Sequence, residues 1–138
     1  MSEFYERAVQ LRATIEPHYN CCASVVIPFA LKAGIPEETL MRITMNFRGG
    51  MRNGGRCGAM CGGIMVLGMF GITDDETIGR YYVKLNQLHH NMLNCSELLK
   101  DYIENDIPRK PFCDGLVYEV IGIVEDILRE KEVLPMIQ

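Results

Sequence analysis

The sequence predicts an all-α fold, in which a single domain over residues 1–138 forms about six or seven helices around a buried, glycine-faced central helix. Apolar residues recur at helical spacing along most of the chain, and no segment alternates strictly between apolar and polar residues. The segment 57–72 has no charged residue, which is typical of a buried helix. With 138 residues, 48% of them hydrophobic, the chain is large enough to form a core.

The expected central helix carries small residues along one side, namely Gly58, Ala59, Gly62 and Gly63. Glycine inside a helix costs about 1 kcal/mol relative to alanine, so this face should gain from the close approach of another backbone or of a prosthetic group. The helix is shorter than the roughly 20 residues that cross a bilayer, and we expect no membrane insertion. Because small residues also allow close contact between two copies, we expect a homodimer.

Two helices are expected before residue 35. Ser2 can cap the first, and Pro17 should end it. Asn20 is the expected N-cap of the second, which should kink at Pro28 and stop at Gly34. The expected apolar face of the first helix consists of Phe4, Ala8, Leu11 and Ile15.

A third helix should begin at Pro36, a residue suited to a first helical position, and end at the glycine pair 49–50. Its expected face is Leu40, Ile43 and Phe47. After the central helix, Thr73 to Glu76 has the form of a capping box, so a fifth helix is expected from there to about Met92. Its expected buried face is Ile78, Tyr82, Leu85 and either His89 or Leu88.

Two further helices are expected near the C-terminal end of the sequence. A short one begins at Asn94 or Ser96, and a proline-containing loop covers residues 105–111. Asp114 can cap the last helix. Its apolar stripe is Leu116, Val120, Ile123, Val124, Ile127 and Leu128.

Charge and composition exclude some classes of function. The chain has 18 acidic and 14 basic residues, a net charge of −4, and no basic run, so nucleic-acid binding is not expected. No positively charged segment followed by an apolar one opens the sequence, and we expect a cytoplasmic protein. The glycine-rich loop lacks the Gly-Lys-Ser/Thr ending of a phosphate-binding loop. His18 is expected to be solvated, and the adjacent His89 and His90 point too far apart to chelate one metal.

Four of the six cysteines share one expected context. Each of Cys21, Cys57, Cys95 and Cys113 closes a loop and opens a helix. Because a helix N-terminus stabilises negative charge, four such cysteines that converge could supply four thiolates. Cys22 and Cys61 do not open helices, and we interpret them as packing residues.

The cysteine pattern resembles that of the C_GCAxxG_C_C family. The segment Cys57-Gly58-Ala59-Met60-Cys61-Gly62 is similar to the family's core motif, and the segment 64–68 to its continuation. Asn20-Cys21, Asn94-Cys95 and Phe112-Cys113 supply the other three cysteines in order. The family name writes Gly-Cys-Ala where this chain reads Cys-Gly-Ala. The resemblance implies a redox-active protein with Cys21, Cys57, Cys95 and Cys113 as its functional cysteines.

Several functions remain open at this point. The four cysteines could ligate an iron–sulfur cluster for electron transfer or redox sensing, although no CxxC pair is present. Gly55, Arg56 and Gly58 would then contact the cofactor, and Arg48, Arg52 and Arg56 would offset its charge. A second hypothesis is metal-free thiol–disulfide exchange, for example between Cys57 and Cys21.

A structural zinc site with four thiolate ligands and a scaffold protein with passive thiols are further alternatives. The sequence leaves open whether the protein is an oxidoreductase or an electron carrier. It also does not identify the expected redox partner.

Overall fold

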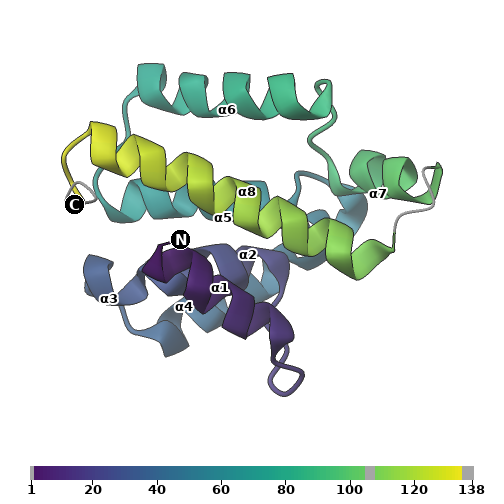
Figure 1. Cartoon of the computed structure of the whole chain (residues 1–138), viewed down its shortest axis with the longest axis horizontal. Coiled ribbons are helices and arrows are strands. Elements are labelled where there is room, and N and C mark those ends of the chain that lie inside the picture. Colours follow the sequence, from purple (N-terminus) through teal and green to yellow (C-terminus); the bar gives the residue numbers. More distant parts are fainter. Residues whose placement is uncertain (1, 105–107, 135–138) are drawn as a thin grey trace.

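The computed structural model describes residues 2–104 and 108–134, and it is all-α, as the sequence predicts. No strand occurs among these residues. The fold is a single domain, drawn in Figure 1. Its elements are α1 (Glu3–Ala13), α2 (Cys21–Val26), η1 (Ile27–Phe29), α3 (Ala30–Ala33), α4 (Glu37–Thr44), η2 (Met45–Phe47), η3 (Gly50–Gly54), α5 (Gly58–Met69), α6 (Asp75–His89), α7 (Cys95–Glu104) and α8 (Arg109–Glu130).

The helices form layers around α5 and α8, which pack against each other at the centre of the molecule. In Figure 1, α6 covers one side of this pair, and α1 and α2 cover the other. The short helix α7 lies at the end where α8 begins. None of the described helices combines the length and the apolar composition that a membrane crossing requires.

The closest helix contact joins α5 to α2. A Cβ atom at Gly58 would lie 2.9 Å from the carbonyl oxygen of Phe47 and 3.5 Å from the backbone nitrogen of Cys22. A Cβ atom at Gly62 would lie 3.0 Å from both the carbonyl oxygen of Cys22 and the Cβ of Val25. Glycine at these two positions therefore lets α2 approach α5 closely. This surface of α5 is covered within the chain, and the homodimer stays a prediction.

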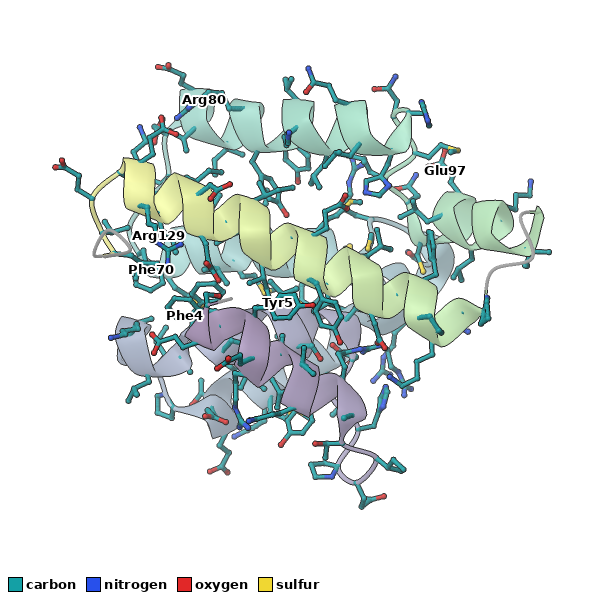
Figure 2. The ribbon with its side chains drawn as sticks, viewed as in Figure 1. Phe4, Tyr5, Phe70, Arg80, Glu97 and Arg129 are labelled. Atoms are coloured by element: carbon teal, nitrogen blue, oxygen red, sulfur yellow. The ribbon has the colours of Figure 1, made fainter. Side chains whose placement is uncertain are left out.

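Burial along α5 is extensive without being complete. Ala59, Met60, Val66 and Leu67 are fully buried, whereas Gly68 is exposed. The buried end of α5 is completed by aromatic rings. Phe29 stacks on Phe4 at 4.3 Å and meets Phe70 edge-on at 6.4 Å. Figure 2 shows Phe4 and Phe70 close together at this end of the molecule.

The expected kink at Pro28 is confirmed. The helix that begins at Cys21 changes at Ile27 into the 3-10 turn η1 and resumes as α3, because proline has no N–H for the helical ladder. Gly34 ends α3 in the left-handed region at φ 72°, as expected.

Two apolar residues predicted to be buried are exposed. Ile15 is 87% exposed, because α1 ends at Ala13 and Thr14 turns the backbone into an extended conformation. Ile43 is 52% exposed, since the short helix α4 buries only Leu40 and Thr44. Both errors come from extending an apolar pattern beyond the face that the neighbouring helices cover.

Two helix starts also differ from the prediction. Asp74, and not Thr73, caps α6 by accepting a hydrogen bond of 2.9 Å from the Thr77 N–H. Helix α8 begins at Arg109, so Asp114 is an internal residue and not a cap. Proline is tolerated at Pro111 because first-turn N–H groups have no helical partner. Of the loop expected over 105–111, residues 105–107 lie outside the described residues.

Replacing Gly63 with alanine should destabilise the protein by about 1–3 kcal/mol, through overpacking that exceeds the gain in helix propensity. A Cβ atom there would lie 2.2 Å from the Tyr81 hydroxyl oxygen and 2.8 Å from a Val120 methyl carbon. Tyr81 cannot yield easily, because it is fully buried and donates a 2.7 Å hydrogen bond to the Met60 carbonyl. Urea denaturation would measure the change.

The matched control is Gly68→Ala in the same helix, where a Cβ atom would meet nothing within 4 Å. We expect this variant to gain roughly 0.5–1 kcal/mol from helix propensity alone. Equal free energies of unfolding for the two variants would refute the packing argument for Gly63.

Candidate functional site

Three of the four predicted helix-start cysteines are where the sequence places them. Cys21 is the first residue of α2, Cys57 is the N-cap residue of α5, and Cys95 is the first residue of α7. Cys113 is the exception, since it lies one turn inside α8. Proline residues before it led to the expectation of a loop, yet the helix has already started there.

Cys57 and Cys95 are joined through the backbone. The Cys57 N–H donates to the Leu93 carbonyl at 2.8 Å, and the Cys95 N–H donates to the Gly55 carbonyl at 2.6 Å. A Cβ atom at Gly50 would lie 2.7 Å from the Cys95 Cβ, so this approach also requires glycine. The start of α7 is therefore fixed against the loop that leads into α5.

The four cysteines interact electrostatically. Cys21 and Cys113 shift each other's pKa, and negative charge on Cys113 raises the pKa values of both Cys57 and Cys95. Cys21 and Cys113 line one cavity, and the Cys95 N–H is bonded to Gly55, two residues before Cys57. Helices α2, α5, α7 and α8 thus bring the four predicted residues into one region.

Cys113 is the cysteine whose environment favours the thiolate. The hydrogen bond from the Cys21 thiol lowers the pKa of Cys113 to about 6, against the opposing effect of burial. Positive charge on Arg109 and Arg12 lowers the pKa of Cys113 further. The same Cys21–Cys113 bond, together with burial, raises the pKa of Cys21 well above its ordinary value. These shifts favour a thiolate at Cys113 and a protonated thiol at Cys21.

Burial opposes the thiolate form at two of the four cysteines. Burial raises the pKa of Cys57 to about 11, even though the N–H groups of Met60 and Ala59 oppose this shift. Cys57 is only 5% exposed. Burial raises the pKa of Cys95 as well. At these helix starts the cost of desolvating a charge exceeds the stabilisation that the helix N-terminus provides.

Cys21 and Cys113 face an open cavity of about 370 Å³. Its other lining residues are Arg12, His18, Asn20, Arg48, Gly49, Arg109 and Lys110. Arg12 is nearly buried, and its guanidinium donates to an Asp114 carboxylate oxygen at 2.6 Å and to the Tyr19 carbonyl at 3.0 Å. The bond between Arg12 and Asp114 joins α1 to α8 beside Cys21 and Cys113.

Sequence reasoning missed Arg12, Arg109 and Asp114. Arg12 and Asp114 are distant in the chain, and no local pattern indicates that they pair. The expected cofactor-binding residues have other contacts. Arg56 lies over the Tyr82 ring at 5.6 Å, and the Gly55 N–H donates to Gly50 and Asn53 within its own loop. Gly58 contacts η2 and α2, as described above.

The sequence model of the family described as "Putative redox-active protein (C_GCAxxG_C_C)" matches residues 19–127, most of the chain. The chain belongs to this family. The comparisons with curated proteins and with solved structures gave no match. Membership supports redox activity. It does not specify the reaction, which has to be inferred from the arrangement of the cysteines.

The two additional cysteines of this C_GCAxxG_C_C protein lie in packing positions. Cys22 is fully buried with its Sγ 3.7 Å from the Met65 Sδ, and burial raises its pKa. Cys61 is half-buried with its Sγ 3.9 Å from the Arg56 carbonyl oxygen, and burial raises its pKa too. Outside this region, His89 lies 2.6 Å from a Glu119 carboxylate oxygen and links α6 to α8.

In this C_GCAxxG_C_C chain, within residues 2–104 and 108–134, no three His, Cys, Asp or Glu side chains are arranged so that they could hold a metal ion. The four cysteines share a region, but their thiols do not form a coordination shell. The donor atoms have the chemistry that an iron–sulfur cluster or zinc requires, and the ligation of either group stays a prediction.

Replacing Cys21 with alanine should raise the pKa of Cys113 toward that of an ordinary thiol, because the largest stabilising contact of the thiolate is lost. In the unmodified protein, the rate of Cys113 alkylation by iodoacetamide should rise as pH increases through about 6. In Cys21→Ala the rise should occur at higher pH, and the rate at neutral pH should fall roughly tenfold.

Cys21→Ser provides the control, since its hydroxyl can still donate a hydrogen bond to the thiolate. Its alkylation profile should stay closer to that of the unmodified protein. Identical profiles for Cys21→Ala and the unmodified protein would show that the Cys21 thiol does not set the pKa of Cys113.

Proposed function

We propose that this chain is a dithiol–disulfide redox protein in which Cys113 is the nucleophile and Cys21 the resolving thiol. One observation carries the proposal: Cys21 and Cys113 line the same open cavity beside Arg12 and Arg109, where Cys21 and the two arginines lower the pKa of Cys113. A thiolate is the attacking species in disulfide exchange, and a pKa of about 6 keeps Cys113 ionised at neutral pH.

The proposed reaction balances as follows. The Cys113 thiolate attacks one sulfur of a substrate disulfide, so that a mixed disulfide forms and one substrate thiolate leaves. Cys21 then transfers its proton to the departing thiolate and attacks the Cys113 sulfur. The second substrate thiolate is released, and a Cys21–Cys113 disulfide remains. Two electrons pass from the protein to the substrate, and an external dithiol returns them in the next cycle.

The surroundings of the pair support the separate roles of the two cysteines. Arg12 and Arg109 favour the charged form of Cys113. The raised pKa of Cys21 keeps its thiol protonated until the second step. Loss of the Cys113 charge in the mixed disulfide removes the hydrogen bond that holds the Cys21 proton, and this makes Cys21 available as a nucleophile.

Iron–sulfur ligation is the second candidate, because the same four cysteines influence one another electrostatically. No group of three or more possible ligands occurs together among the described residues. Disulfide chemistry needs only two cysteines, and Cys21 and Cys113 line one cavity. Zinc ligation meets the same objection as the cluster.

Oxidation of the reduced protein with hydroxyethyl disulfide should yield a Cys21–Cys113 disulfide, identified by mass spectrometry of peptides. Cys113→Ser should lose reaction at this pair, since its nucleophile is absent. Cys21→Ser should accumulate the mixed disulfide on Cys113, because the resolving thiol is absent. Protein purified without oxygen should be assayed in parallel for iron, sulfide and zinc.

The matched control is Cys61→Ala, which removes a cysteine that lies outside the pair. This variant should form the Cys21–Cys113 disulfide at the normal rate. Broad visible absorption with matching iron and sulfide, and no disulfide after oxidation, would overturn the dithiol proposal in favour of the cluster. Unchanged oxidation of Cys113→Ser at Cys21 would overturn the assignment of the nucleophile.

A further inference from the structure

The cavity beside Cys113 is strongly basic, although the chain as a whole is acidic with a net charge of −4. Arg12, Arg48, Arg109 and Lys110 all line it. A second open cavity of about 530 Å³ adjoins the first, since His18, Arg48, Gly49 and Arg109 line both. The second cavity adds Arg52, Asn53 and Gly54, and neither lining includes an acidic residue among those described.

Only part of this positive charge is neutralised within the structure. Asp114 lies 2.6 Å from the Arg12 guanidinium and 3.0 Å from the Lys110 ammonium, so it offsets these two cations. In the part of the chain that the structure describes, Arg48, Arg52 and Arg109 form no ion pair with a carboxylate. Arg48 and Arg52 therefore face the cavities with unneutralised charge, while Arg109 has, among the described residues, only the Cys113 sulfur as a possible negative partner.

The loop that presents Arg48 and Arg52 has an unusual backbone. Gly49, Gly50, Met51 and Arg52 are four successive residues with φ between 59° and 67°, in the left-handed region. Met51 and Arg52 adopt this conformation without the freedom of glycine, which is uncommon and concentrates at functional sites. The loop is held in place by the Gly55 N–H, which donates to the Gly50 carbonyl at 2.8 Å, and by the contact of Gly50 with Cys95.

We propose that the substrate of Cys113 is a low-molecular-mass disulfide that carries carboxylate groups, held by Arg48, Arg52 and Arg109. This inference rests on the proposed function and adds the class of substrate to it. Guanidinium groups bind carboxylates through paired, charge-assisted hydrogen bonds. A cavity of about 370 Å³ is the size of a small-molecule site, and Cys113 lies in its wall. The anion is bound in the cavity while one of its sulfur atoms meets the Cys113 thiolate.

Three disulfides that differ in charge would test this proposal on the fully reduced chain. Dithiodipropionate has two carboxylates, hydroxyethyl disulfide is neutral, and cystamine has two ammonium groups. Each rate of Cys21–Cys113 disulfide formation would be divided by the rate with a free small thiol, to remove intrinsic reactivity. At low salt the normalised rate should be highest for dithiodipropionate and lowest for cystamine, with a difference on the order of tenfold or more. Added salt should reduce this difference.

The double substitution Arg48→Gln with Arg52→Gln should lower the rate with dithiodipropionate several-fold and leave the rate with hydroxyethyl disulfide unchanged. Neither arginine is among the groups that set the pKa of Cys113, so the nucleophile itself should be unaffected. The matched control is Lys32→Gln with Lys84→Gln. It removes two exposed positive charges from α3 and α6 and should keep the preference for the dianion.

The outcomes separate the two proposals. If none of the three disulfides oxidises the Cys21–Cys113 pair, the proposed function is wrong and the substrate class falls with it. If hydroxyethyl disulfide reacts and dithiodipropionate has no normalised advantage, the function stands and the substrate class is wrong. The role of the arginines is also overturned if the arginine variant keeps the preference for dithiodipropionate. It is overturned as well if the lysine control loses this preference to the same extent as the arginine variant. The salt dependence of the unmodified chain tests the same point without any substitution.

Discussion

The close packing of α2 on α5 is the constraint on which the rest of this structure depends. Gly58 lies against Cys22, and Gly62, one turn later in α5, lies against Cys22 and Val25. The contacts therefore advance along both helices together, so α2 and α5 run in a similar direction. Their N-terminal ends therefore lie at the same end of the molecule, which brings Cys21 and Cys57 into one region. A larger residue at either glycine would separate the helices and move these two cysteines apart.

Burial and hydrogen bonding, more than helix position, determine which cysteine is reactive. Cys57 has a helix N-terminus beside it and still favours the thiol, because it is desolvated. Cys113 lies inside a helix and favours the thiolate, because a thiol and two arginines stabilise its charge. The Arg12–Asp114 ion pair, 2.6 Å long, holds one of these arginines in place between α1 and α8. Four similar sequence contexts thus give two chemically different kinds of cysteine.

Much of this arrangement was predictable from local sequence signals. The all-α class, the kink at Pro28, the end at Gly34 and the helix starts at Cys21, Cys57 and Cys95 follow from capping residues, proline, glycine and apolar spacing. The position of Cys113 inside α8 was not predicted, because proline is compatible with both a loop and a first helical turn. The pairing of Arg12 with Asp114, and the position of Arg109 beside Cys113, are tertiary contacts that no local pattern records.

The proposed cycle changes the charge of the cavity. When the Cys113 thiolate becomes part of a disulfide, one negative charge disappears beside Arg12 and Arg109, while the cations lining the cavity remain. Anions should therefore bind more tightly to the oxidised form than to the reduced form. Binding equilibria are reciprocal, so a bound anion in turn stabilises the disulfide and lowers the reduction potential of the pair. The concentration of anions around the protein thereby becomes one of the quantities that set its redox equilibrium.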